Sequence, residues 1–107
     1  MEDRLVIKAF AALAHPMRLK IFRVLVIAGR GGMTPTAIVQ QLGLPAATLS
    51  FHLKELNHAG LVTQEREGRS LIYRAAYDQM DALIAFMKDN CCAGLPAEAT
   101  ALAACAC

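Results

Sequence analysis

The sequence has no long uncharged apolar segment, and this absence excludes a protein that crosses a membrane by a helix. Apolar residues make up 56% of the chain, but no run approaches the roughly 18 uncharged residues of a membrane span. The start, Met1-Glu2-Asp3-Arg4, also lacks the basic and then apolar order of a secretory signal. We therefore expect a cytoplasmic protein without a membrane partner. Its 107 residues indicate one domain with a modest core, which pairing with a second copy would enlarge.

Cysteine is absent from residues 1–90, and all four cysteines fall near the C-terminus: Cys91, Cys92, Cys105 and Cys107. A disulfide framework would staple the whole of a small domain, which these positions do not allow. A bond between the adjacent Cys91 and Cys92 would be strained. In a reducing cytoplasm, clustered thiols are more often ligands or redox switches than structural bridges.

Basic residues are in only slight excess, and a net charge of +2 is too small to identify a nucleic-acid partner. The distribution of charge is more informative. Residues 1–60 hold seven Lys or Arg and three Asp or Glu, whereas residues 61–107 hold four and six. A basic first part and an acidic remainder suit a protein that presents one face to an anion.

Apolar periodicity predicts two helices in the first third of the chain. The first, Asp3 to Leu13, has an apolar side opposite Arg4 and Lys8. That side comprises Leu5, Ile7, Ala9, Phe10 and Leu13. The second runs from Pro16 to Ile27, with proline in its first turn and Gly29 after its end. We expect Leu19, Phe22 and Val26 to face inward and Arg18, Lys20 and Arg23 to face outward.

A helix, a short turn and a second helix are expected next. Thr34 is predicted as the N-cap of a helix that covers Thr36 to Leu42, with Pro35 in its first turn. Gly43-Leu44-Pro45 forms the turn, and the following helix, Ala46 to Ala59, ends at Gly60. The apolar stripe of that helix is Leu49, Leu53 and Leu56. This arrangement is the helix-turn-helix signature.

Two alternating segments predict a β-hairpin after these helices. Leu61 to Arg66 and Ser70 to Arg74 alternate apolar and polar residues. Between them, Glu67-Gly68-Arg69 supplies a glycine turn of hairpin length. A hairpin directly after a recognition helix is a wing, so the predicted fold class is mainly α with a small β-hairpin (α+β), a winged helix-turn-helix.

A fifth helix is expected to start at Tyr77-Asp78, with Asp78 as its N-cap, and to end near Asn90. Its apolar stripe is interpreted as core at a dimer seam, because so small a domain has few other partners for it. The stripe comprises Met80, Leu83, Ile84 and Met87. The Ala-rich remainder, Ala97 to Cys107, is compatible with a short helix.

Three motifs in one register resemble ArsR/SmtB-type repressors, and the match covers residues 5–90. Leu13-Ala14-His15-Pro16-Met17-Arg18-Leu19 is similar to the start of their second helix. Ser50-Phe51-His52-Leu53-Lys54-Glu55-Leu56, continued by Asn57-His58-Ala59-Gly60-Leu61-Val62, resembles their recognition helix and its exit. Glu65-Arg66-Glu67-Gly68-Arg69 with Leu71-Ile72-Tyr73-Arg74 resembles their wing. The resemblance implies a homodimer through the first and last helices that binds an inverted-repeat operator on double-stranded DNA and is released by an inducer.

Two metal-site patterns of this family are absent from the chain. The first is a Cys-x-Cys pattern on the third helix, where Thr36-Ala37-Ile38-Val39 has no cysteine. The second uses Asp and His on the last helix; Asp78 and Asp81 are present, but no histidine lies beyond His58. The C-terminal cysteines instead resemble those of arsenic-responsive members, which carry a Cys-Cys pair at the end of the last helix and a further cysteine beyond it.

The predicted recognition helix has five outward positions: Ala46, Ala47, Ser50, Phe51 and Lys54. The N-terminal residues of such a helix face base edges in the major groove. Ser50 is suited to hydrogen-bond a base or phosphate, whereas Phe51 and the two alanines suit thymine methyl groups. We therefore expect only modest direct reading of base sequence.

Basic side chains on this helix and on the wing are predicted to contact phosphates. Lys54, Arg66 and Arg69 are the main candidates, with Arg74 as a further one. Phosphate contacts position a protein on DNA without specifying a sequence. Arg69, at the wing tip, is also a candidate for a minor-groove contact.

The three histidines lack the spacing of metal ligands, so structural roles are favoured. His15 is expected to cap the second helix, and His52 to make a local hydrogen bond. His58 lies near a helix C-terminus, where a cationic imidazole suits the dipole.

We predict that residues 1–90 form the DNA-binding and dimerisation domain and that residues 91–107 form a sensor tail. Thiolates select soft metal species. A trivalent arsenic or antimony centre takes three sulfurs in a pyramid, because its lone pair occupies the fourth direction. Cys91 and Cys92 would supply two sulfurs and either Cys105 or Cys107 the third. The chain would then need no resident cofactor, and its inducer would be arsenite, antimonite or a methylated arsenical.

Several alternatives remain open at the sequence level. The same DNA-binding module would fit a sensor of cadmium, lead or zinc, or a redox switch in which Cys91 or Cys92 pairs with a tail cysteine. A winged helix that binds protein instead of DNA is another alternative. An enzyme with a cysteine nucleophile would need a base near the thiol, and all three histidines lie in the DNA-binding half. The sequence therefore predicts a transcriptional repressor and not an enzyme.

Overall fold

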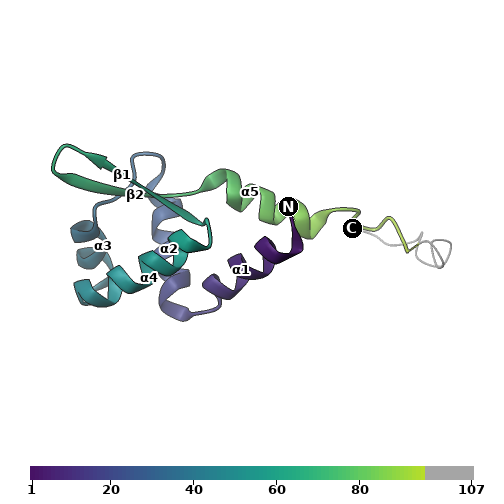
Figure 1. The fold of residues 1–107 in the computed structure, drawn as a ribbon, viewed down its shortest axis with the longest axis horizontal. Coiled ribbons are helices and arrows are strands. Elements are labelled where there is room, and N and C mark those ends of the chain that lie inside the picture. The colour runs from purple at the N-terminus through teal and green to yellow at the C-terminus, as the bar shows by residue number, and fades with distance from the viewer. Residues whose placement is uncertain (96–107) are drawn as a thin grey trace.

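A computed structural model of the chain describes residues 1–95, and residues 96–107 lie outside that description. The elements in chain order are α1 (Asp3–Leu13), α2 (Pro16–Ala28), α3 (Pro35–Leu42), α4 (Ala46–His58), β1 (Val62–Glu67), β2 (Ser70–Ala75) and α5 (Tyr77–Lys88). The two strands pair antiparallel, in a register that runs from Val62↔Ala75 to Glu67↔Ser70. The predicted α+β winged helix-turn-helix is confirmed (Figure 1).

The recognition helix α4 lies over the centre of the core. Leu49, Leu53 and Leu56 are each at most 2% exposed, as their spacing predicts. They belong to one cluster with buried residues of α2, α3 and the start of the hairpin: Ile21, Leu25, Ile38, Leu61 and Val62. Fully burying a side chain of this size contributes roughly 1.5–3 kcal/mol, so this cluster holds α4 against the rest of the domain.

The predicted helix caps are present at α2 and α3. The Nδ1 atom of His15 accepts a hydrogen bond from the Met17 N–H at 3.1 Å. The Thr34 hydroxyl accepts one from the Ala37 N–H at 3.2 Å. Each cap satisfies a backbone donor that the first helical turn leaves without an intrahelical partner.

A hydrogen-bonded cap at the C-terminal end of α4 turns the chain toward the hairpin. The N–H of Leu61 donates to the carbonyl of Leu56 at 3.0 Å, and that of Gly60 donates to Asn57 at 3.0 Å. This is the Schellman pattern, and it requires the left-handed conformation that Gly60 adopts at φ +77°. Gly60 therefore ends α4 as the sequence predicts.

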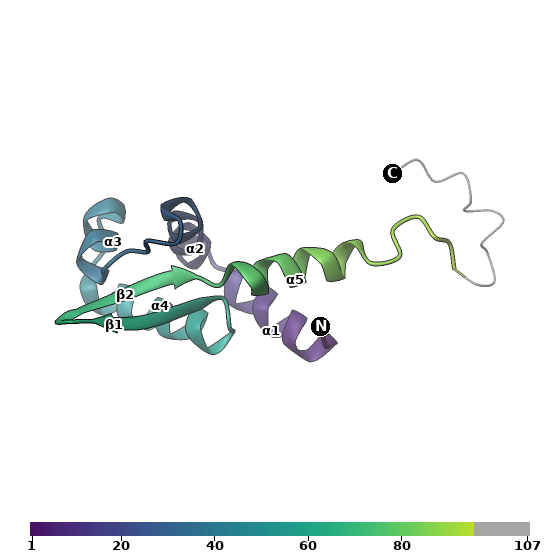
Figure 2. The same ribbon diagram turned by 90° about the horizontal axis from the view of Figure 1, so that it is seen from above.

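The elements divide between two ends of the molecule. Figures 1 and 2 both place the hairpin tip and α3 at one end, and the N-terminus of α1 and the C-terminal half of α5 at the other. These two groups of elements are therefore separated along the long direction of the domain.

The predicted inward face of α2 is correct at Phe22 but wrong at Leu19, and the apolar side predicted for α1 includes only one fully buried residue, Ala9. The buried residues of α2 are Ile21, Phe22 and Leu25, whereas Leu19 is 46% exposed and Val26 is only partly buried. Because α2 is apolar on nearly every side, its sequence does not identify the side that faces the core. In α1 the buried residues are Val6, Ala9 and Ala12, and the predicted apolar residues Leu5, Ile7 and Phe10 are exposed.

Two further local predictions are wrong. Asp78 lies inside the first turn of α5, whose N-cap is Ala76 without a side-chain hydrogen bond. Arg18 does not simply face solvent, because its Nε donates to the Ala12 carbonyl at 2.6 Å and joins the end of α1 to α2. The remaining boundaries agree with prediction to within two residues. Within residues 1–95, no helix is both long and apolar enough to cross a bilayer.

Candidate nucleic-acid interface

The outward side of α4 forms the first part of the candidate interface. All five predicted residues are exposed: Ala46, Ala47, Ser50, Phe51 and Lys54. Phe51 is 57% exposed, which is unusual for an aromatic side chain on an isolated domain. The N-terminal end of α4 therefore presents small, hydroxylic and aromatic groups to a partner, and one cation follows them along the helix.

A shallow groove lies beside this helix, between α3, α4 and the inner face of β2. Its volume is about 320 Å³, and most of its lining is apolar, including Val39, Leu49, Leu71 and Tyr73. Thr36 and Ser50 add exposed hydroxyl groups to the lining. Sequence reasoning missed Thr36 as a candidate interface residue. The available signal was a polar residue one position after the proline at the start of the first helix of the motif.

The hairpin forms the second part of the candidate interface. Arg66 on β1 and Arg69 in the turn are exposed. Neither has a hydrogen bond or ion pair to another residue in the part of the chain that the structure describes. Two cations that are not paired within the domain are able to meet phosphates without first breaking an ion pair.

Arg74 differs from these two arginines. Its guanidinium donates to the carboxylates of Glu65 and Glu67 and to the backbone carbonyl of Arg30. Its side chain is 25% exposed. The structure therefore directs this cation toward groups of the same chain, which does not fit the phosphate contact suggested by the sequence.

His52 lies on the inward side of α4, at 6% exposure. Its ring packs against the ring of His15, with centroids 4.7 Å apart. Burial lowers the pKa of His52, and the neighbouring His15 and Arg18 lower it further. The local hydrogen bond expected from the sequence is not formed by Nδ1, which is buried and has no partner among residues 1–95. His58, the last residue of α4, is exposed, as its predicted place at the helix end allows.

The turn that follows α5 carries the first two predicted ligands, Cys91 and Cys92. The Sγ atoms of Cys91 and Cys92 lie 3.7 Å apart, and Cys91 is a free, exposed cysteine. They sit in a tight turn in which the Cys91 N–H donates to Lys88 and the Ala93 N–H donates to Asn90. Asn90 and Cys92 both adopt left-handed backbone conformations, at φ 59°. Such a conformation is costly for cysteine and persists only where its surroundings favour it.

The other two predicted ligands, Cys105 and Cys107, lie outside the described residues. Residues 1–95 contain no group of three or more His, Cys, Asp or Glu side chains able to hold a metal ion. The structure thus brings Cys91 and Cys92 together without testing the completed site.

The N-terminus of α1 and the C-terminal half of α5 lie at the end of the molecule opposite the hairpin tip (Figure 2), and both helices carry exposed apolar side chains. On α5, Leu83 is buried, whereas Ile84 is 52% and Met87 63% exposed. On α1, Leu5 and Phe10 are 40% and 41% exposed. The predicted stripe of α5 is therefore divided between the core and an uncovered face.

This arrangement of helices and hairpin defines the class of protein, a winged helix-turn-helix transcriptional regulator. The family model "Helix-turn-helix domain" matches residues 13–65. The chain is 30% identical to the HTH-type transcriptional regulator YgaV of Escherichia coli, over 76% of this chain and 80% of that protein. It is 31% identical to a "probable mercury resistance operon repressor" of Streptomyces lividans, over 83% of this chain and 76% of that protein.

A solution structure of Mb0332 from Mycobacterium bovis is also similar. It superposes with a TM-score of 0.64 and 31% identity, over 84% of this chain and 89% of that one. It is described as a homodimeric winged helix-turn-helix DNA-binding domain of a possible ArsR-family transcriptional regulator. The chain belongs to the ArsR/SmtB-type family of helix-turn-helix transcriptional regulators, and it is not an enzyme.

Proposed function

We propose that this regulator is a dimeric repressor that leaves its operator when trivalent arsenic binds its C-terminal thiolates. The observation that carries the proposal is the placement of two kinds of group on one small domain. Exposed cations without an ion pair among residues 1–95 lie on the recognition helix and the hairpin, and two cysteine sulfurs 3.7 Å apart lie just after α5. The first set suits a polyanion and the second a soft, thiol-seeking ion.

The operator half of the proposal assigns α4 to the major groove and the hairpin to the flanking backbone. Ser50 hydrogen-bonds a base or phosphate, and Ala46, Ala47 and Phe51 contact thymine methyl groups. Lys54, Arg66 and Arg69 contact phosphates and set the register. Direct reading of bases is modest, because three of the exposed positions on α4 are apolar.

The proposed dimer rests on the uncovered apolar faces of α1 and α5. A homodimer buries Leu5, Phe10, Ile84 and Met87 against the same residues of the second copy. In a monomer of this size these side chains stay exposed. Pairing also presents two copies of α4 to DNA, and an inverted repeat matches that symmetry when its half-sites lie about one helical turn, roughly 34 Å, apart. The homodimeric state of the similar Mb0332 domain supports this assignment.

The sensor half assigns residues 1–90 to DNA binding and dimerisation and residues 91–107 to inducer binding. Cys91 and Cys92 supply two thiolates to a pyramidal As(III) or Sb(III) centre, and Cys105 or Cys107 supplies the third. The turn at residues 88–93 favours this role, because it holds two sulfurs close together at the helix end. The inducer is a reversibly bound ligand, and the fold needs no resident cofactor.

Inducer binding changes the affinity for DNA through the dimer seam. Closing the tail on the end of α5 shifts the packing of Ile84 and Met87 and so changes the spacing of the two recognition helices. A small rotation there costs several phosphate contacts at once. The coupling is reciprocal, so operator DNA lowers the affinity for the inducer by the same factor.

A second candidate keeps the same DNA-binding module and changes the signal. The similar Streptomyces lividans protein is described as a repressor of a mercury resistance operon, which favours other soft ions. Mercury, cadmium or lead would use the same thiolates, whereas zinc would prefer four ligands in a tetrahedron. Oxidation would instead join Cys91 or Cys92 to a tail cysteine.

Fluorescence anisotropy with a labelled inverted-repeat operator tests both halves of the proposal. Operator affinity must fall steeply with salt, because counterions are released at each phosphate contact. Under full reduction, arsenite or antimonite must release the DNA at lower concentrations than cadmium, lead, zinc or mercury. Release by diamide alone would identify the oxidation switch instead, and affinity that is indifferent to salt would contradict DNA repression.

A further inference from the structure

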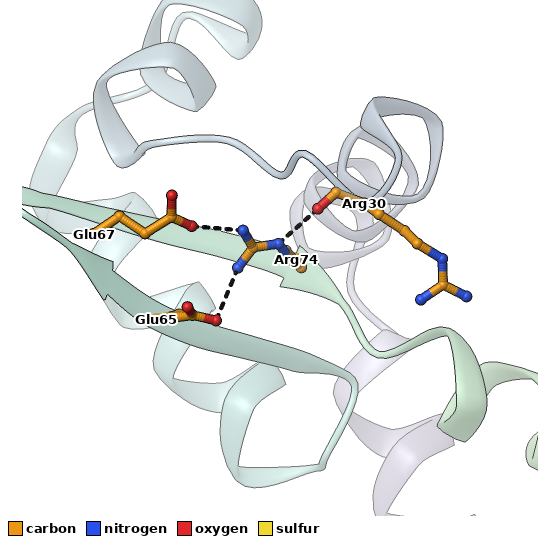
Figure 3. Close-up of polar contacts among 4 residues, drawn as sticks. All are labelled: Arg30, Glu65, Glu67 and Arg74. Carbon is orange, nitrogen blue, oxygen red and sulfur yellow. Dashed lines mark hydrogen bonds and ion pairs between the residues drawn. The ribbon is translucent and has the colours of Figure 1, made fainter.

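All three guanidinium nitrogens of Arg74 donate hydrogen bonds to groups of the same chain (Figure 3). Nη2 meets the Glu67 carboxylate at 2.7 Å, and Nη1 meets that of Glu65 at 3.4 Å. Nε donates to the backbone carbonyl of Arg30 at 2.7 Å. One side chain therefore ties both strands of the hairpin to the segment between α2 and α3.

The same segment approaches the hairpin at two further points. Met33 and Tyr73 exchange backbone hydrogen bonds of 2.9 and 2.8 Å. Gly32, at φ +72°, lies so close to β2 that an added Cβ would come within 2.6 Å of the Tyr73 carbonyl oxygen. A two-stranded hairpin is marginally stable alone, so these contacts fix its position on the domain.

The charges around Arg74 have a second consequence. Glu65 and Glu67 lie on the hairpin beside the cations that would meet DNA, and their side chains are 67% and 52% exposed. Unpaired, two carboxylates here would repel phosphates and oppose Arg66 and Arg69. Ion-pairing to Arg74 draws both toward the body of the domain.

We infer that Arg74 is a positioning residue for operator binding: it holds the hairpin, and with it Arg69, at the angle that reaches the DNA. This inference rests on the proposed repressor function. A direct phosphate contact by Arg74 fits the geometry poorly, because its donors face two carboxylates and a carbonyl of the same chain. The side chain acts through the residues that it orders.

A double-mutant cycle with Arg69→Ala separates these roles. In the wild type, Arg69→Ala is expected to weaken operator affinity about tenfold. In the Arg74→Gln background the same change is expected to weaken operator affinity less than about threefold, because the hairpin no longer holds Arg69 against the DNA. Equal costs in both backgrounds would overturn the inference, since a direct contact or a partial loss of folded protein gives additive effects. The inference also fails if Arg69→Ala has no effect in the wild type.

Gly32→Ala is a second variant that disturbs the docking of the hairpin without changing any charge. It is expected to reduce the cost of Arg69→Ala in the same way, and an unchanged cost would contradict the inference. If Arg74→Gln loses its cooperative thermal transition, Arg74→Lys replaces it in the cycle. A reduced cost of Arg69→Ala in that background then supports the inference, and an unchanged cost contradicts it. A wild-type protein that binds no operator would instead contradict the proposed function, and this inference with it.

Discussion

The ring of His52 on the recognition helix α4 packs against the ring of His15, the N-cap of α2, with centroids 4.7 Å apart. The cap uses the lone pair on His15 Nδ1 to accept the Met17 N–H. His52 is buried, with its own Nδ1 lacking a partner among residues 1–95. The contact therefore joins the start of α2 to the middle of α4.

This contact predicts that the domain becomes less stable in mild acid. The folded-state pKa of His52 is lowered from 6.5 by burial and by the nearby His15 and Arg18, and only Glu55 raises it. As pH falls below 6.5, the unfolded chain binds a proton that the folded chain does not, so the free energy of unfolding decreases. The decrease ends once pH falls below the folded-state pKa, where both states are protonated.

Replacing His52→Leu tests that assignment. The variant is expected to flatten the dependence of unfolding free energy on pH between about pH 7 and about pH 5. At neutral pH it should gain about 1 kcal/mol, because a buried nitrogen without a partner is removed. Urea unfolding at several pH values measures both effects. His58→Gln, on the exposed end of the same helix, serves as the matched control, and a slope that His52→Leu leaves unchanged would refute the assignment.

Lys54→Ala is expected to weaken binding to operator and to unrelated DNA by similar factors, because a phosphate contact carries no sequence information. The slope of log affinity against log salt should become shallower by about 0.9, the value for one lost contact. Arg4→Ala removes the same charge from the first turn of α1, whose N-terminus lies away from the hairpin tip (Figure 1), and it should leave the slope unchanged. Equal slopes for wild type and Lys54→Ala would remove Lys54 from the interface.

Ile84→Asp is expected to convert the dimer to a monomer, because it places a charge in the proposed seam of α1 and α5. Sedimentation equilibrium reports the change, and circular dichroism checks that the helices persist. Ile27 is an equally suitable residue for the control, since it is 75% exposed on α2. Ile27→Asp should remain dimeric, and a dimeric Ile84→Asp variant would move the seam elsewhere.

The parts of the fold that the sequence predicted well are those in which one pattern had one interpretation. Leu49, Leu53 and Leu56 form the single apolar stripe of α4, and their burial follows from it. The apolar residues of α2 surround the helix instead, so the choice of Ile21 over Leu19 depends on where α4 packs. Sequence periodicity does not contain that information.

The candidate site was predicted unevenly for a similar reason. The exposed residues of α4 follow from the helix period once its stripe is known. The role of Arg74 depends on a backbone carbonyl 44 positions away, at Arg30, which no local pattern indicates. Likewise, adjacency in sequence made Cys91 and Cys92 obvious partners, but the strained turn that brings their sulfurs together is a property of the folded helix end.

Arsenite-induced operator release by fully reduced protein is the most direct test of the sensor, measured on the wild type and on four single Cys→Ser variants. The account predicts that Cys91→Ser and Cys92→Ser bind the operator normally but no longer release it at arsenite concentrations that free the wild type. Of Cys105→Ser and Cys107→Ser, one should behave like them and the other like the wild type. Normal release by Cys91→Ser and Cys92→Ser would contradict the three-thiolate sensor.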